Sequence, residues 1–346
     1  MAQMSFDRSH PLYQEDLKQI AEKIHKESVV GKSFMITGAT GLLGTLLIDT
    51  LMWMNINLDS DIKIYALGRS QKRMKDRFSE YWDDDRFEFH EYDATKEAPF
   101  IKTDFIIHCA GSSHPKLFAE DPVGTLMGNI IGTNGVLEVA RKSGAISLIL
   151  SSGEIYGDNT EGRCKMDEEF QGKLSLNNSR SCYSEGKRAV ESLCQSYLAQ
   201  YGMSIKIARP CRIFGPTMTT ADNKASAQFL KSAKEGKDIV LKSSGEQMFS
   251  YIYGADAVSA LLTILLKGEN GVPYNVSDDR SDVRLKDFAT TISDIANVGF
   301  EIVSTGEAGG SKVQNAILDN SRLKSLGWNS TRDIKSNIRR TLVILN

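Results

Sequence analysis

Tyr183 and Lys187 lie four residues apart in the segment Tyr-Ser-Glu-Gly-Lys, a spacing that places both side chains on one face of a helix. A neighbouring ammonium favours the ionised form of a phenol, whose pKa is ordinarily about 10, so the pair could act as a general base. Ser152 lies about 30 residues earlier, at the end of a predicted strand. Its hydroxyl could hold a substrate alcohol beside the phenol.

A glycine-rich segment near the N-terminus could bind a dinucleotide. Gly38, Gly41 and Gly44 follow an apolar run and precede a predicted helix. Glycines allow a tight turn and a close approach of the backbone to a pyrophosphate, which then faces free N–H groups at the helix start. A bound oxidised nicotinamide would also favour the Tyr183 phenolate. We therefore predict an NAD or NADP site with contacts from Gly38, Thr40, Gly41, Leu42, Leu43 and Gly44.

The end of the second predicted strand normally selects between NAD and NADP. Here it reads Ala-Leu-Gly-Arg-Ser over 66–70, without the acid that binds ribose hydroxyls. Arg69 could bind the 2′-phosphate of NADP, or it could be a solvated surface residue, so both cofactors stay open. Asp93, after the third strand, is placed to meet the adenine edge, or it is an ordinary turn aspartate.

Short apolar runs alternate with helix-period segments from Ser33 onward, a pattern typical of parallel strands joined by crossover helices. We predict strands at 33–37, 62–67, 87–92, 105–108, 147–151 and 204–208, and helices at 44–54, 132–142 and 184–201. This is an α/β fold with a doubly wound, Rossmann-type parallel sheet. After Pro210 the alternation weakens, and helices at 224–235 and 255–266 indicate a smaller lobe that completes a cleft.

Three parts of the chain follow from this reading. Residues 1–30 form an N-terminal helical extension, 31–209 the dinucleotide-binding domain with the catalytic residues, and 210–346 mostly a C-terminal substrate-binding lobe. Within the extension, residues 12–24 have the spacing of an amphipathic helix. Its apolar face could contact another subunit or a membrane surface, but both charge signs on its polar face favour packing on its own domain.

Composition excludes several classes of protein. Apolar residues make up 41% and charged residues 25% of the chain, and the net charge of −2 argues against a nucleic-acid partner. The most apolar run, 255–266, is too short to span a bilayer, and we see no secretory signal. The five cysteines include no Cys-x-x-Cys pair, which argues against a disulfide framework or a structural zinc site and favours a reducing cytoplasm. The histidines do not pair with acids at ligand spacing, which argues against a catalytic metal.

Several ordered motifs resemble the extended short-chain dehydrogenase/reductases of the nucleotide-sugar epimerase/dehydratase group, over nearly all of residues 30–340. They are the segments 38–44, 108–111, 129–133, 151–157, Tyr183 with Lys187, 209–210, 214–216 and 326–328. The resemblance implies further cofactor contacts from Ala94, Cys109, Ala110, Gly111, Asn129, Tyr183, Lys187 and Pro210. It also implies substrate contacts from Ser112, Ser152, Gly153, Glu154, Arg212 and Phe249, and a homodimer formed by the helices that carry Tyr183 and follow Asn129.

Enzymes of this group oxidise C4 of a hexose, while the tyrosine takes the hydroxyl proton. The resulting 4-keto sugar can be reduced on its other face, lose water across C5 and C6, or lose CO2 from a C6 carboxylate. The segment Ser152-Gly153-Glu154 lacks the aspartate of common 4,6-dehydratases but keeps the glutamate. Residues 181–188 are very similar to the corresponding stretch of UDP-glucuronate decarboxylases, so decarboxylation is the leading prediction, with Glu154 near C5 and C6.

Other functions stay open. They are a nucleotide-sugar 4,6-dehydratase or 4-epimerase, an NADPH-dependent carbonyl reductase, and a non-catalytic dinucleotide-binding regulator. Glu154 could also be only a partner for a neighbouring backbone N–H. Aligned with the family pattern Arg-[Ser/Asp]-x-x-Tyr-x-x-Asp, Phe249 stands where an arginine normally contacts the substrate's diphosphate or carboxylate. Arg212, where relatives often have asparagine, could supply the missing charge.

Overall fold

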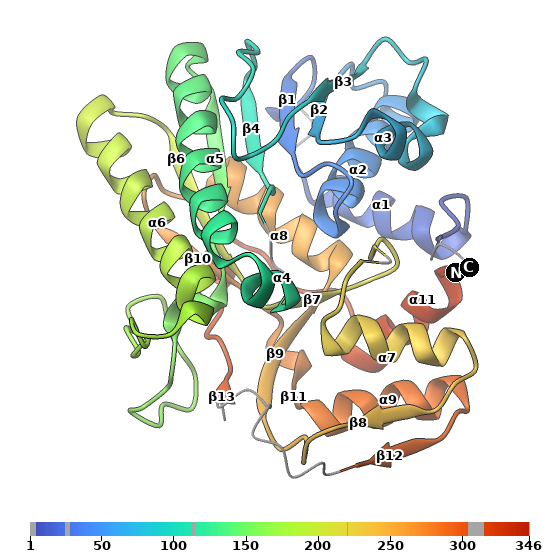
Figure 1. The fold of residues 1–346 in the computed structure, drawn as a ribbon. Helices are drawn as coiled ribbons and strands as arrows, with labels where there is room; N and C mark the ends of the chain where they lie inside the picture. The colour runs from blue at the N-terminus through green and yellow to red at the C-terminus, as the bar shows by residue number, and fades with distance from the viewer. Residues whose placement is uncertain (1–4, 25–27, 112–114, 220, 304–314, 346) are drawn as a thin grey trace.

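A seven-stranded parallel sheet forms the centre of the protein (Figure 1). The computed structural model describes residues 5–24, 28–111, 115–219, 221–303 and 315–345. The strand order is β10-β6-β5-β4-β1-β2-β3, and every neighbouring pair is parallel. The strands are β1 (Ser33–Thr37), β2 (Lys63–Gly68), β3 (Phe87–Glu91), β4 (Phe105–His108), β5 (Ile146–Leu150), β6 (Ile205–Pro210) and β10 (Pro273–Val276). The predicted doubly wound sheet is confirmed.

Helices cover both faces of this sheet, so its strands are buried on both sides. Neighbouring residues of β1 point to opposite faces: Phe34 belongs to one apolar core and Met35 to the other. The core around Met35 includes residues of α5 (Pro122–Ser143) and α6 (Cys182–Tyr201). The core around Phe34 includes residues of α1 (Pro11–Lys23), α2 (Leu42–Leu58) and α8 (Gly254–Lys267). In Figure 1, α5 and α6 lie together on one side of the sheet.

Among the predicted elements, α5 differs most from its prediction, and the strand β10 of the large sheet was not predicted. No predicted strand boundary is displaced by more than two residues, but α5 begins at Pro122 rather than at Gly132. The Asp121 carboxylate accepts the Gly124 N–H at 2.9 Å, and Pro122 occupies the first helical position. An aspartate cap followed by proline is a strong helix start. The longer helix carries Asn129 on its buried side.

The N-terminal helix α1 packs against α2 and α8 of its own chain. Two buried tyrosines fix it there: the Tyr13 hydroxyl donates to Asp49 at 2.6 Å, and the Tyr253 hydroxyl donates to Asp16 at 2.6 Å. Near the other end of the chain, the Asp7 N–H donates to the Ile344 carbonyl at 3.0 Å. The first and last described segments of the chain therefore lie side by side, as Figure 1 shows. No helix among the described residues is long and apolar enough to cross a membrane.

A smaller sheet is built around β9 (Met248–Tyr253), which pairs with β7 (Arg212–Phe214), β11 (Asp282–Arg284) and β13 (Asn315–Ala316). A two-stranded sheet joins β8 (Ile239–Leu241) to β12 (Phe300–Ile302). The remaining helices are α3 (Gln71–Arg77), α4 (Pro115–Glu120), α7 (Ala225–Lys234), α9 (Leu285–Ala296), α10 (Ser321–Ser325) and α11 (Ile334–Ile344). Two elements that follow residue 209 are part of the large α/β layer: β10 is a strand of the large sheet, and α8 packs against it. The division of the chain into domains stays a prediction.

Candidate active site

The catalytic pair lies at the start of α6. Tyr183 is in the first turn and Lys187 follows one turn later, so both side chains share a face, and both are buried. The Lys187 ammonium donates to the Leu150 carbonyl at 2.7 Å and lies 5.9 Å from the centre of the Tyr183 ring. Because Leu150 ends β5, this hydrogen bond brings the pair to the carboxyl edge of the sheet.

Burial changes the acidity of both groups in opposite directions. Burial raises the pKa of the Tyr183 phenol to about 12, although the Ser152 hydroxyl lowers it, and the Glu154 charge adds to the rise. Burial lowers the pKa of the Lys187 ammonium to about 8. A buried amine is costly to charge and a buried phenol is costly to ionise. Near pH 7 the unliganded site therefore holds a neutral phenol beside a largely protonated lysine.

Phe118 covers one face of the tyrosine ring. It lies on the short helix α4, and its ring stacks on Tyr183 with centroids 4.6 Å apart and an interplanar angle of 13°. This contact fixes the orientation of the phenol and adds to its burial. Sequence reasoning missed Phe118, and its local sequence carries no signal that would have revealed it.

The segment after β5 forms a short 3-10 helix, Gly153–Tyr156, that presents Ser152 and Glu154. The Ser152 hydroxyl accepts the Glu154 N–H at 3.2 Å, which caps this turn and orients the hydroxyl. At Gly153, an added Cβ would lie 3.1 Å from Leu318 and 3.5 Å from the Pro210 carbonyl, so a larger residue would crowd the turn. The predicted catalytic residues Ser152, Tyr183 and Lys187 are thus brought together.

Two of the predicted substrate-binding residues, Arg212 and Phe249, contact each other. Arg212 opens β7, and its guanidinium carbon lies 3.4 Å from the centre of the Phe249 ring on the neighbouring strand β9. The same guanidinium lies 3.9 Å from the Glu154 carboxylate. Arg212, Phe249 and Glu154, three of the predicted substrate-binding residues, therefore form one cluster beside Ser152.

The glycine loop meets the loop after β4 at the switch point between β1 and β4. Gly38 has a φ of +67°, and an added Cβ would lie 2.9 Å from both the Cys109 carbonyl carbon and the Ala110 nitrogen. Gly41 caps α2 without a side-chain hydrogen bond. The first N–H groups of a helix have no partner within it, so those of Leu42 and Leu43 can face a pyrophosphate.

The side-chain oxygen of Asn129, a buried hydrogen-bond acceptor near the carboxyl edge of the sheet, also fits a dinucleotide site. Among the described residues, the Asn129 side-chain oxygen is buried without a hydrogen-bond partner. An added Cβ at Gly111 would lie 3.4 Å from this oxygen and 3.6 Å from the Lys187 ammonium, so Gly111 keeps the space between them open. An unpaired buried amide oxygen is costly unless a ligand donor reaches it. The residues present therefore fit a nicotinamide dinucleotide at this edge.

The remaining predicted cofactor contacts lie along the same edge of the sheet. Arg69 is exposed just after β2. Asp93 accepts the Thr95 N–H at 3.0 Å, and this backbone hydrogen bond lowers the pKa of its carboxyl group. Ala94 packs under α5, where Gly132 permits the approach, and Pro210 ends β6. The predicted contact Ser112 lies outside the described residues.

His108 has a structural environment. It is buried at the end of β4, and its Nδ1 atom shares a hydrogen bond with the Thr37 hydroxyl at 2.8 Å. Burial lowers the pKa of His108 to about 3, and the positive charge of Lys187 adds to the shift. His108 is therefore neutral near pH 7. Within the described ranges, no cluster of three or more His, Cys, Asp or Glu side chains could hold a metal ion.

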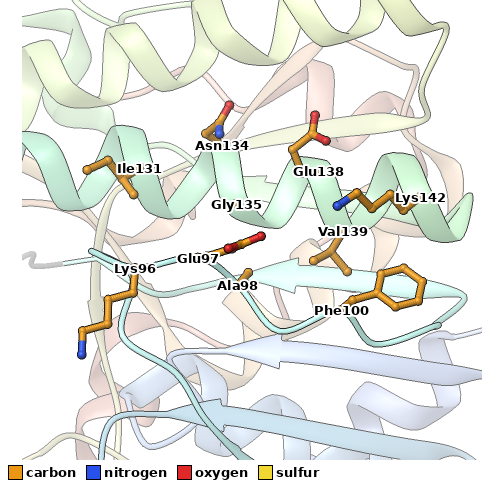
Figure 2. Close-up of a pocket in the computed structure, with 10 residues that line it drawn as sticks. All are labelled: Lys96, Glu97, Ala98, Phe100, Ile131, Asn134, Gly135, Glu138, Val139 and Lys142. Atoms are coloured by element: carbon orange, nitrogen blue, oxygen red, sulfur yellow. The ribbon is translucent and has the colours of Figure 1, made fainter.

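A hollow of about 420 Å³ lies away from these residues. Figure 2 shows that it opens between α5 and the segment 96–100, and none of the candidate site residues lines it. Its lining includes two lysines and two glutamates, Lys96, Lys142, Glu97 and Glu138. Nothing about this hollow connects it to the chemistry of Tyr183.

Comparisons with known proteins confirm the predicted resemblance. The model of the NAD dependent epimerase/dehydratase family matches residues 34–277. UDP-glucuronic acid decarboxylase 6 of Arabidopsis thaliana is 31% identical over 268 residues, 78% of this chain and 75% of that protein. UDP-glucuronic acid decarboxylase 1 of Xenopus tropicalis is 29% identical over 339 residues, 98% of this chain and 75% of that protein.

A solved structure extends the likeness to the fold. UDP-glucuronic acid 4-epimerase from Bacillus cereus, in complex with UDP-glucuronic acid and NAD, superposes with a TM-score of 0.75 at 17% identity. The superposition covers 90% of this chain and 98% of that one. At this identity the likeness concerns the fold alone. From the match over residues 34–277 and the 31% identity to a relative, the chain belongs to the NAD dependent epimerase/dehydratase family.

Proposed function

We propose that the protein is a nucleotide-sugar enzyme that oxidises C4 of the sugar transiently and removes CO2 from a UDP-glucuronate-like substrate. The observation that carries the proposal is the placement of Glu154 beside Ser152, in a site that also holds Tyr183 and Lys187. Support comes from relatives named UDP-glucuronic acid decarboxylase, which are 29% and 31% identical over most of the chain.

In this proposal, Ser152 and Tyr183 hold the sugar's C4 hydroxyl, and Tyr183 removes its proton. Lys187 stabilises the phenolate and is itself held by the Leu150 carbonyl at 2.7 Å. When bound, a nicotinamide would supply the hydride acceptor and donor at C4 and a positive charge beside the phenol. Phe118 keeps water from one face of the Tyr183 ring.

A ketone at C4 makes the C6 carboxylate a β-keto acid. The C5–C6 bond then breaks, its electron pair moves onto the C4 oxygen as an enolate, and CO2 leaves. Tyr183, now protonated, donates a hydrogen bond to this oxygen and stabilises its charge. C5 then takes up a proton from solvent, and Tyr183 returns its proton to the C4 oxygen as the ketone is reduced. In this proposal the carboxylate of Glu154, whose side chain is 54% exposed, faces C5 and C6.

The test is incubation of the NAD-loaded protein with UDP-glucuronate carrying ¹³C at C6. We expect ¹³CO2 and a UDP-pentose, detected by mass spectrometry. Loss of water, or a product of unchanged mass with inverted C4, would instead indicate the dehydratase or the epimerase. Steady net oxidation of NADPH would indicate a carbonyl reductase, and tight cofactor binding with no turnover of any sugar nucleotide would indicate a regulator.

We further propose that the site accepts NADP as well as NAD. No acid lies at the end of β2, and the exposed Arg69 can meet a 2′-phosphate. Replacing Arg69 with alanine should weaken NADP binding by about ten- to one-hundredfold, the scale of one charged hydrogen bond, and leave NAD binding unchanged. Titration of the apoprotein with each cofactor measures both affinities. An equal effect on the two cofactors, or none, would assign Arg69 to the solvated surface.

A homodimer stays a prediction. The helix α5 exposes Val123 and Met127, one turn apart, with 70% and 42% of their surfaces accessible. An apolar pair on an exposed helix face supports a contact between subunits.

A further inference from the structure

Arg212 and Phe249 lie in contact at the sugar end of the proposed site. The guanidinium stacks on the ring at 3.4 Å, and its charged edge lies 3.9 Å from Glu154. Glu154 is two residues from Ser152, whose hydroxyl interacts with Tyr183. Arg212 therefore stands beside the residues that handle the reacting carbon atoms.

Phe249 is a fixed platform for this arginine. Only 3% of its surface is exposed. Its ring packs edge to face on Tyr251, with centroids 6.5 Å apart, and Tyr251 stacks on Phe288 at 4.3 Å. An aromatic face attracts a guanidinium and leaves its N–H groups, which lie in the plane, free to donate. The stack thus holds the plane of Arg212 in place before a substrate binds.

The charge of Arg212 is only partly satisfied within the protein. Its side chain is 31% exposed and the Glu154 side chain is 54% exposed, so their ion pair at 3.9 Å is long and open to solvent. A guanidinium has five donors and can bind two carboxylates at once. A substrate carboxylate next to Glu154 would otherwise meet a like charge, which disfavours its binding.

We propose that Arg212, positioned by Phe249, binds the carboxylate of a uronic acid sugar and bridges it to Glu154. The inference rests on the proposed nucleotide-sugar function and assigns the substrate's sugar as an acid. Arg212 is then a specificity-determining residue, and Phe249 is a positioning residue that acts through it.

The test measures binding to the NAD-loaded Tyr183→Phe protein, which holds a substrate without consuming it. UDP-glucuronate, UDP-glucose and UDP are titrated by calorimetry. The Arg212→Gln substitution should raise the Kd of UDP-glucuronate by about ten- to one-hundredfold, the scale of a charged hydrogen bond, and leave the other two Kd values unchanged. Phe249→Leu should raise the Kd of UDP-glucuronate by a smaller factor, about threefold, because the charge remains but its platform is lost.

The matched control is Arg141→Gln, which removes an equal charge from an exposed pair with Glu138 on α5 and should change none of the three affinities. Equal weakening of all three ligands by Arg212→Gln would place the cation at the diphosphate and overturn the inference. The inference would also be overturned if the Tyr183→Phe protein, which keeps Arg212, bound UDP-glucuronate and UDP-glucose with equal affinity. Selective binding of UDP-glucuronate without ¹³CO2 release would uphold the inference while the proposed decarboxylation fails.

Discussion

Replacing Tyr183 with phenylalanine should lower kcat by about a thousandfold or more while leaving the Kd for NAD unchanged. The substitution removes only the hydroxyl, and the ring can keep its stack on Phe118 at 4.6 Å. General acid–base catalysis commonly contributes between about a hundredfold and ten-thousandfold, and here one phenol serves both proton transfers at the C4 oxygen. Single-turnover assays and cofactor titration would measure the two quantities separately.

A second tyrosine of α6 provides the control for this experiment. Tyr201 ends the helix on the surface, with 47% of its area exposed, and its hydroxyl meets only the neighbouring Gln200 side chain among the described contacts. Tyr201→Phe removes the same group outside the site and should keep full turnover. If Tyr183→Phe also kept turnover, another base would have to take the C4 proton and the proposed mechanism would be wrong.

The parts of the site that could be predicted from the sequence are local patterns. Tyr183 and Lys187 share a helix face because of their spacing, and the glycine loop is marked by the strand before it and the helix after it. Both signals lie within a few residues. Periodicity located six strands of the large sheet for the same reason, because buried strands are short and apolar. It missed the seventh, β10, where Asn275 interrupts the apolar run.

The start of α5 was missed because its own sequence argues against a helix. Gly124 and Gly128, which lie before the predicted start at Gly132, each lower helix propensity by about 1 kcal/mol relative to alanine. At Gly132, an added Cβ would lie 2.8 Å from Ala94, so the glycine serves close packing against a distant loop. A requirement set by tertiary contact cannot be read from the helix alone.

Contacts between distant segments were beyond local reasoning. Phe118 stacks on Tyr183 from a separate helix, and Arg212 reaches Phe249 because β7 pairs with β9 in one particular register. Sequence reasoning predicted only that Arg212 could supply the positive charge that Phe249 lacks. Only the pairing of β7 with β9 showed that the two side chains are in contact, with the guanidinium stacked on the ring.

The N-terminal helix also has a larger part in the fold than its place in the sequence indicated. The Asp16 carboxylate accepts hydrogen bonds from Tyr253 at 2.6 Å and from Arg340 at 2.7 Å. Tyr253 belongs to β9, the strand that carries Phe249. The helix α1 therefore anchors the strand that supports the proposed substrate cation, although it contributes no residue to the site.

Replacing Lys187 with methionine should abolish most activity and yet stabilise the protein near pH 7. Burial lowers the pKa of Lys187 from 10.5 to about 8, so the folded state binds its proton less tightly than the unfolded state does. A pKa shift of this size means that the buried ammonium destabilises the folded state by about 3 kcal/mol. Methionine removes this cost, but it leaves the Leu150 carbonyl without its donor, which costs about 1 kcal/mol. The variant should therefore gain about 2 kcal/mol, a few degrees in Tm.

The pH dependence of this gain identifies its cause. Below about pH 8 the buried ammonium is charged in both states and its full cost is present, whereas between about pH 8 and 10.5 the folded protein releases the proton and the cost disappears. The Tm difference between Lys187→Met and the unsubstituted protein should thus be largest at about pH 7 and shrink by about pH 9.5. Lys72→Met, at a side chain 85% exposed, should show no such trend. If the Tm difference were the same at both pH values, the stabilisation would come from packing of the methionine and not from removal of a buried charge. The buried ammonium of Lys187 would then not destabilise the folded protein.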